Sequence, residues 1–172
     1  MKKKFLSQTR INRIKAQGYE GYSDLVINDL AFGNRFAYQV CVSILIIGVS
    51  LSNFTILSVM MGVAFLAVIL PNHPFDYFYN YFLAKRMGKP QLPPRSKQLK
   101  FTCILATIWI GATLYLINVG MMNAAFVAGY SLVGVALLVS TTDYCIPSMI
   151  FNATERFFSR NPSSSIKASN KS

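Results

Sequence analysis

The chain has 172 residues, of which 53% are hydrophobic and only 13% are charged, and its formal net charge is +11. A soluble domain of average composition carries about 25% charged residues, so the composition argues against an ordinary soluble protein. The basic residues flank two long uncharged blocks, so membrane topology explains them better than a nucleic-acid partner does. We therefore predict a single-domain, all-α integral membrane protein that has the lipid bilayer as its first partner.

The first 35 residues form a polar and basic N-terminal segment, which we expect to be retained and cytoplasmic. Ser23 and Asp24 precede the apolar residues 25–30, a pattern that predicts a short capped helix along the membrane interface. Gly33 and Asn34 are expected to end that helix before the first span.

Two uncharged blocks follow, and they define a membrane domain over residues 36–160. They cover 36–75 and 101–142, which is 40 and 42 residues. A bilayer core about 30 Å thick needs roughly 20 apolar residues in a helix, so each block fits two spans and a tight turn. The predicted spans are about 36–51, 54–70, 101–119 and 122–142.

An aromatic-rich segment separates the two blocks. It opens on His73-Pro74-Phe75-Asp76 and places six aromatic residues among the eight from Phe75 to Phe82. Such density is typical of an amphipathic helix at the level of the lipid headgroups, which we predict over 74–87. A second interfacial helix is predicted over 147–159, and the polar tail 161–172 is expected to be disordered.

The distribution of Lys and Arg predicts the orientation. Seven lie in residues 1–35, six in 71–100 and four in 143–172, and neither short turn between paired spans has any. Loops rich in Lys and Arg stay in the cytoplasm. Both termini and the functional surface are therefore expected on the cytoplasmic side of the membrane. The two halves have the same orientation, which predicts two hairpins related as a parallel repeat.

Three polar residues are candidates for chemistry. Cys145 leaves the fourth span beside Asp143, and His73 and Asp76 lie three residues apart on the aromatic segment. One interpretation is a catalytic set in which Cys145 is the nucleophile, His73 the base and Asp76 the orienting group. The other is that His73 and Asp76 cap a helix and anchor it at the interface. The spacing of His and Cys predicts no metal site, and we expect no cofactor.

Small residues recur every fourth position at the start of the fourth span. They are Gly120, Ala124 and Ala128, with Ala125 and Gly129 in a second register. This spacing either allows close helix approach, including a homo-oligomer or a membrane-protein partner, or is lipid-facing filler.

Several motifs lie around the spans, over about residues 30–152. They are Asn34-Arg35-Phe36, His73-Pro74-Phe75-Asp76, Tyr79-Asn80, Pro93-Pro94 with Phe101, and Tyr144-Cys145. With these motifs in this order, the chain resembles a family of small bacterial membrane proteins known as a domain of unknown function, which implies a location in the bacterial inner membrane. In that family's pattern a second cysteine lies three residues after the one matching Cys145. This chain has Ser148 there, which weakens a dithiol mechanism.

Three functions stay open from the sequence, and it leaves undecided whether the protein is an enzyme. The first is a scaffold or accessory subunit of the inner membrane. The second is a thiol-dependent redox or sulfur-handling protein that uses Cys145. The third is a carrier for a small neutral solute. The absence of an ionisable carboxylate or base inside the spans argues against proton-coupled transport.

Overall fold

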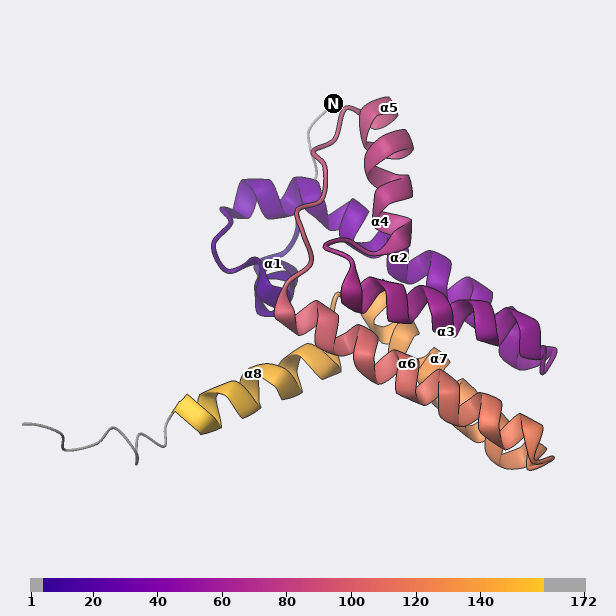
Figure 1. The fold of residues 1–172 in the computed structure, drawn as a ribbon. Helices are drawn as coiled ribbons and strands as arrows, with labels where there is room; N and C mark the ends of the chain where they lie inside the picture. The colour runs from indigo at the N-terminus through magenta and orange to yellow at the C-terminus, as the bar shows by residue number, and fades with distance from the viewer. Residues whose placement is uncertain (1–4, 160–172) are drawn as a thin grey trace, which may run out of the picture.

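The computed structural model of the chain describes residues 5–159 and is all-α, as predicted (Figure 1). The predicted disordered tail, 161–172, lies outside the described residues. Two short stretches are π-helical turns, called η1 and η2. The helical elements are α1 Gln8–Ile14, η1 Lys15–Tyr19, α2 Asp24–Ser50, α3 Phe54–Ile69, α4 Pro74–Phe78, η2 Tyr79–Ala84, α5 Lys85–Met87, α6 Lys97–Asn118, α7 Met122–Thr142 and α8 Ile146–Ser159.

Candidate membrane spans are found among these helices, as the sequence predicted. Helices α2, α6 and α7 are each long and apolar enough to cross a bilayer. Helix α3 has 16 residues, a length of about 24 Å that falls short of a bilayer core of about 30 Å. With the helix that follows it, α3 forms a bent pair with an angle of 78°, which supplies a fourth candidate span when it is counted as one.

The long helices form a ring of four. Helices α2 and α3 are joined by the turn 51–53, and α6 and α7 by the turn 119–121. In the ring, α3 packs on α6 and α7 packs on α2, which closes the two predicted hairpins onto each other (Figure 1). A buried apolar core fills the ring; it includes Leu45, Leu57, Ile110 and Leu132.

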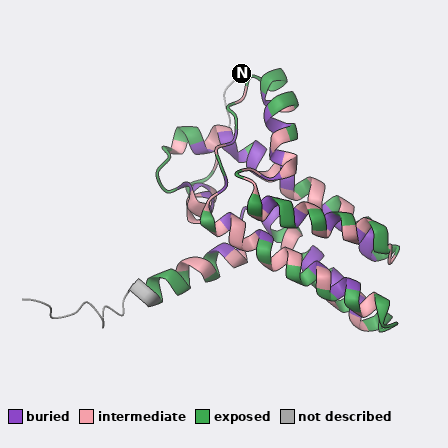
Figure 2. Cartoon of the chain, in the orientation of Figure 1, coloured by how far each residue is buried: buried purple, intermediate pink, exposed green. Residues whose placement is uncertain are grey.

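The outer faces of the ring are apolar as well. Figure 2 shows exposed residues along the outside of these helices and buried ones toward their contacts. Large exposed side chains include Phe65, Ile108 and Val127, which are 54%, 64% and 70% exposed. Helices that are apolar all round are typical of membrane spans, because lipid covers their outer faces.

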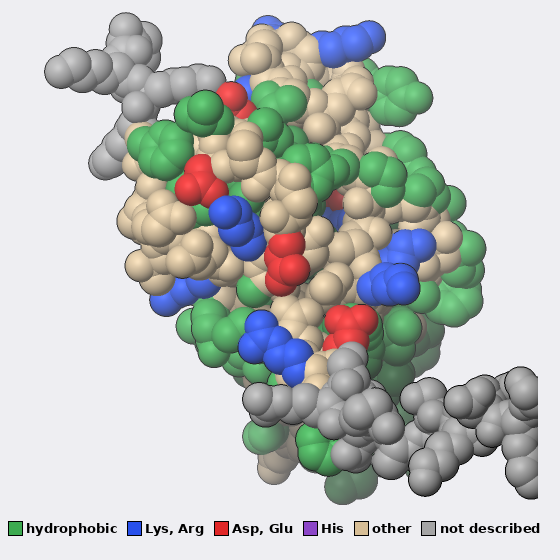
Figure 3. All heavy atoms as spheres, turned by 90° about the vertical axis from the view of Figure 1, so that its left-hand side faces the viewer, with side chains coloured by type: hydrophobic (Ala, Val, Ile, Leu, Met, Phe, Trp, Pro, Cys, Tyr) green, Lys and Arg blue, Asp and Glu red, His purple; other side chains and the backbone are tan. Residues whose placement is uncertain are grey.

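The charged end of the ring carries a folded cap. It consists of α1, η1, the first turns of α2, the helix Pro74–Met87, the connector 88–96 and α8 (Figure 1). Helix α1 is part of this cap, since Ile11 and Ile14 are buried against Tyr79 and Leu99. Turned to this end, Figure 3 shows Lys, Arg, Asp and Glu side chains gathered over the cap.

The expected helix break at Gly33 and Asn34 is wrong, because α2 runs unbroken from Asp24 to Ser50. Packing explains both residues. A Cβ at Gly33 would lie 2.5 Å from the ring of Tyr79, so glycine allows the aromatic helix to approach α2 closely. The Asn34 side chain donates to Gln17 Oε1 at 3.1 Å, which ties η1 to α2.

Candidate functional site

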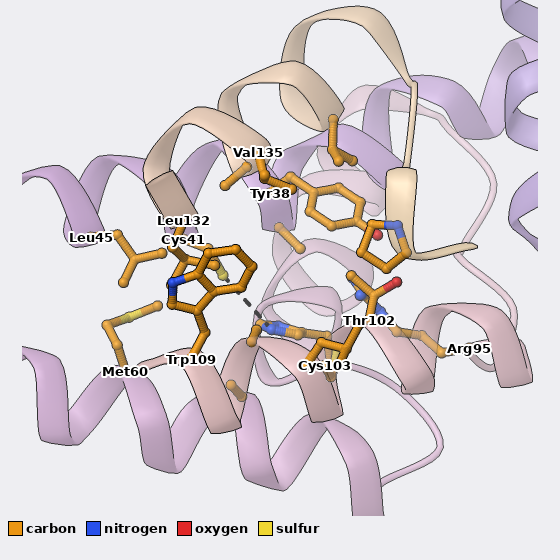
Figure 4. Close-up of a pocket in the computed structure, with 18 residues that line it drawn as sticks. Tyr38, Cys41, Leu45, Met60, Arg95, Thr102, Cys103, Trp109, Leu132 and Val135 are labelled. Atoms are coloured by element: carbon orange, nitrogen blue, oxygen red, sulfur yellow. Dashed lines mark hydrogen bonds between the residues drawn. The ribbon is translucent and has the colours of Figure 1, made fainter. Parts of the chain in front are cut away.

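A cavity of about 120 Å³ lies inside the ring, toward its charged end (Figure 4). Leu45, Met60, Trp109 and Leu132 form its deep, apolar part. Polar side chains border it where the spans meet the cap. They are Tyr38 and Cys41 from α2, His73 from the break between α3 and α4, Arg95 from the connector, and Thr102 and Cys103 from α6.

The polar border is built around a buried ion pair. Arg95 Nε donates to Asp76 Oδ2 at 2.6 Å, and a terminal nitrogen of Arg95 donates to Asp76 Oδ1 at 3.1 Å. The two side chains are only 4% and 3% exposed. The Arg95 backbone N–H donates to the carbonyl of Pro71 at 2.7 Å. Two-point pairing of this kind fixes a guanidinium in one orientation, so the connector is locked onto the start of α4.

His73 is the N-cap of α4. Its Nδ1 accepts from the Phe75 N–H at 3.2 Å, while its own N–H donates to Asp76 Oδ2 at 3.1 Å. This is a reciprocal capping box with Pro74 at the first helical position. The predicted helix cap is therefore confirmed, and anchoring of this helix at the membrane interface stays a prediction.

The capping bond also determines which ring nitrogen of His73 carries the proton. Because Nδ1 is an acceptor, the neutral imidazole has its proton on Nε2, which lies 3.8 Å from Cys41 Sγ. The side chain is 4% exposed. Burial, followed by the nearby positive charge of Arg95, lowers the pKa of His73 to about 3. The imidazole is thus neutral at physiological pH and presents an N–H to the cysteine of α2.

The structure places the three predicted catalytic residues in two different settings. His73 and Asp76 form the capping box of α4, and the Asp76 carboxylate binds Arg95 and the His73 backbone. Cys145 is 3% exposed; its sulfur accepts from Ser148 Oγ at 3.1 Å and lies 3.4 Å from Thr102 Oγ1. The cysteine beside His73 is Cys41. A catalytic role for the predicted set stays a prediction.

Tyr38 carries the polar atom that the fold leaves without a partner. Among the described residues, the only buried side-chain oxygens or nitrogens that lack a hydrogen bond are the hydroxyls of Tyr38 and Tyr79. Tyr79 is 0% exposed in the cap, whereas Tyr38 lines the cavity. The guanidinium carbon of Arg95 lies 5.5 Å from the centre of the Tyr38 ring. A buried hydroxyl without a partner costs about 1–3 kcal/mol, so its position on a cavity wall points to a ligand.

Sequence reasoning missed Tyr38 and Arg95. Arg95 follows Pro93-Pro94 directly and precedes the third span, so in the sequence its charge indicates only which side of the membrane this segment lies on. Tyr38 lies in the uncharged first span, where an aromatic residue has no distinguishing pattern. Only the fold brings residues from α2, the connector and α6 together.

The small residues of α7 are used unequally. Ala125 and Gly129 are buried, and a Cβ at Gly129 would lie 2.8 Å from both methyl groups of Val49 in α2. Ala124 and Ala128 are only half-buried, and the Ala128 carbonyl accepts the Trp109 indole N–H at 3.0 Å. Gly120 lies in the turn with φ 78°, where an added Cβ would meet nothing within 4 Å. Within the chain, close helix approach thus uses the second register, while Gly120 serves the turn.

A family model described as "Domain of unknown function (DUF4395)" matches residues 32–156. The chain belongs to this family. The DUF4395 region contains every residue of the cavity and the Asp76–Arg95 pair, whereas α1 and η1 precede it. No curated protein and no solved structure matches the chain.

Proposed function

We propose that this DUF4395 protein is a multi-pass protein of the bacterial inner membrane that binds a small, largely apolar solute in the cavity of its helix ring. The observation that carries the proposal is the unpartnered Tyr38 hydroxyl on the wall of a 120 Å³ cavity.

Cavity size and lining narrow the class of ligand. An apolar cavity of about 150 Å³ accommodates a molecule the size of benzene, so the ligand is of that size or smaller. The deep part of the cavity offers only apolar side chains such as Leu45, Met60 and Leu132. The Tyr38 hydroxyl offers one hydrogen-bond donor. A compact apolar molecule with a single acceptor, such as a carbonyl, matches both features.

The orientation in the membrane follows from the charges. Four crossings, made by α2, α3, α6 and α7 with Pro74–Met87 left in the cap, put both termini on the same side. All 17 Lys and Arg residues of the sequence lie in residues 1–35, 71–100 and 143–172, and none lies in the two short turns at the opposite end of the spans, which supports a cytoplasmic location for the side of the cap. A C-terminal fusion to green fluorescent protein should fluoresce, and a fusion to alkaline phosphatase should be inactive. The opposite pattern would refute this orientation.

The other two functions fit the structure less directly. A scaffold or accessory subunit needs no internal cavity with a polar border. We therefore prefer solute binding to a scaffold function. A thiol-dependent function is favoured by Cys41 and Cys103, which line the cavity, and by the 3.8 Å approach of His73 Nε2 to Cys41. If thiol chemistry is the function, Cys41→Ser and Cys103→Ser should abolish complementation of a deletion strain. Solute binding alone should tolerate both changes.

Trp109 makes binding measurable. It is the single Trp of the sequence and lines the cavity. Its fluorescence in mild detergent should change when cyclopentanone is added. Cyclopentane, which has the same ring but no acceptor, should bind more weakly. The Tyr38→Phe variant should reduce the preference for the ketone by roughly 2- to 12-fold, as expected for one hydrogen bond worth about 0.5–1.5 kcal/mol.

Two variants make this experiment decisive. Tyr130→Phe removes a phenol hydroxyl whose partner is Ser50 at 3.0 Å, outside the cavity, and should leave the ketone preference unchanged. Ala136→Leu adds bulk to the cavity wall and should abolish binding of both probes. Equal binding of both probes to the unmodified protein, or no effect of Tyr38→Phe, would overturn the proposed role of Tyr38. No binding of either probe would overturn the proposed class of solute.

A further inference from the structure

A second hollow, of about 390 Å³, lies on the surface of the cap and is separate from the cavity. We call it the cationic groove. It lies along α2, where the cap meets the first span, and side chains of α1 and of the connector complete it. The lining residues are Leu6, Arg10, Asn28, Asp29, Ala31, Phe32, Arg35, Gln39 and Lys89.

Three cations from three separate segments converge on this groove. Arg10 comes from α1, Arg35 from α2 and Lys89 from the connector. The lining contains one carboxylate, that of Asp29, and Asp143 pairs with both arginines from behind, so three cations against two carboxylates leave a net positive charge of one. The amides of Asn28 and Gln39 add uncharged hydrogen-bonding groups to the walls. Chain segments distant in sequence thus bring together donors suited to a group with several anionic oxygens.

The two arginines are held in place from behind by Asp143. Arg10 Nε donates to Asp143 Oδ2 at 2.9 Å, and Arg35 donates to both carboxylate oxygens at 2.6 Å. Asp143 is 1% exposed, and its left-handed backbone (φ 57°) ends α7. A guanidinium has five N–H groups. These bonds use one N–H of Arg10 and two of Arg35, and a third N–H of Arg35 donates to the Thr141 carbonyl at 2.8 Å. The carboxylate therefore orients both side chains and leaves further N–H groups of each available to the groove.

Lys89 is positioned from the other side. Its Nζ lies 4.4 Å from the centre of the Phe32 ring, a cation–π contact, and both residues line the groove. Phe32 is 40% exposed, and Leu25, about two turns earlier on α2 and outside the groove, is 71% exposed. An apolar ring thus borders the cations near the point where α2 passes from the cap into the membrane. A phosphate with acyl chains attached fits this boundary better than a freely soluble phosphate does.

We propose that the cationic groove binds the phosphate of an anionic phospholipid headgroup, which seats the cap on the membrane surface. The three cations contact the phosphate oxygens, and the Phe32 side of the groove lies toward the acyl chains. This site does not depend on the proposed solute cavity, because the two share no lining residue. It also requires Leu6 and Arg10, which precede the DUF4395 region.

Native mass spectrometry of the full chain in mild detergent tests the proposal, with phosphatidylglycerol and phosphatidylcholine as added lipids. Phosphatidylglycerol should bind more tightly. Lys89→Gln should weaken its binding about fivefold, since one Lys near an anionic lipid contributes about 1 kcal/mol. Lys85→Gln is the matched control, because Lys85 is an exposed cation outside the groove, and it should have little effect. Arg10→Gln should weaken binding as well, with Arg35 still paired to Asp143.

Each alternative has its own result. Equal losses in Lys89→Gln and Lys85→Gln would show that net charge attracts the lipid without a site, and would overturn the proposal. Equal affinity for both lipids would overturn it as well. Displacement of phosphatidylglycerol by millimolar inorganic phosphate would show that the groove takes a soluble phosphate instead. The cyclopentanone response of Trp109 should be unchanged in Lys89→Gln, which keeps this test separate from that of the cavity.

Discussion

Acid should destabilise this protein through His73. Burial and the charge of Arg95 lower the pKa of His73 to about 3 in the folded state, whereas an unfolded His titrates near 6.5. Below pH 6.5 the unfolded state binds a proton that the folded state excludes, so the free energy of unfolding falls as the pH falls toward 3. Above pH 6.5 both states hold neutral His73, and its contribution is constant. Between pH 7.5 and 5.0 the expected loss is about 2 kcal/mol, from 1.36 kcal/mol per pH unit over about 1.5 units.

The assay is guanidinium unfolding in mild detergent, followed by Trp109 fluorescence at pH 7.5, 6.5, 5.5 and 5.0. The comparison is His73→Asn, because Asn is a good N-cap and its side chain does not titrate in this range. His73 is the single His of the sequence, so the difference in pH dependence between the two proteins belongs to it. The His73→Asn variant should lose about 2 kcal/mol less between pH 7.5 and 5.0. Parallel curves for the two proteins would refute a buried, neutral His73.

Three further changes probe the packing and the ion pairs, and each is measured by the same unfolding assay at pH 7.5. Arg95→Met should destabilise the fold by about 3–5 kcal/mol, because it leaves the Asp76 carboxylate buried without its partner. Adding Asp76→Asn should recover part of that loss. An unchanged loss in the double variant would contradict the ion-pair explanation. Gly129→Ala should cost about 1–3 kcal/mol by overpacking against α2, whereas Gly134→Ala on the same helix, where a Cβ meets nothing within 4 Å, should cost nothing. Asp143→Asn removes the charge that two arginines bind but keeps a residue that tolerates the left-handed backbone. It should lower the free energy of unfolding by about 1.5–3 kcal/mol. A loss below about 0.5 kcal/mol would show that the arginines find other partners.

The sequence predicted the spans and caps because those features are local. The uncharged blocks correspond to the helix ring, and the His73-Pro74-Phe75-Asp76 pattern corresponds to a capping box. The sequence did not predict the continuation of α2 through Gly33, because a glycine that breaks a helix and one that admits a neighbouring ring look the same. The Tyr79 ring that explains Gly33 lies 46 residues further along the chain.

The candidate site was only half predictable for the same reason. Cys145, His73 and Asp76 were chosen because they are reactive residue types near span ends. Their partners depend on long-range packing: Asp76 binds Arg95, 19 residues away, and Cys41 lies beside His73, 32 residues away. A pattern of residue types does not indicate which cysteine a histidine meets. It also does not indicate which buried hydroxyl lacks a hydrogen-bond partner, and that lack is what distinguishes Tyr38.

The cavity has a polar end and an apolar end. Tyr38, Arg95 and Thr102 lie at its charged end. Leu45 is about two turns further along α2 than Tyr38, and Trp109 is about two turns further along α6 than Thr102. A solute with one acceptor would therefore enter with its apolar part toward the membrane centre and its acceptor toward the cap. The bidentate pair of Arg95 with Asp76 holds the guanidinium near the Tyr38 ring, so the electrostatic environment of the hydroxyl is fixed before a solute binds. Because Arg95 also joins the connector to α4, the polar end of the cavity and the cap share this one side chain.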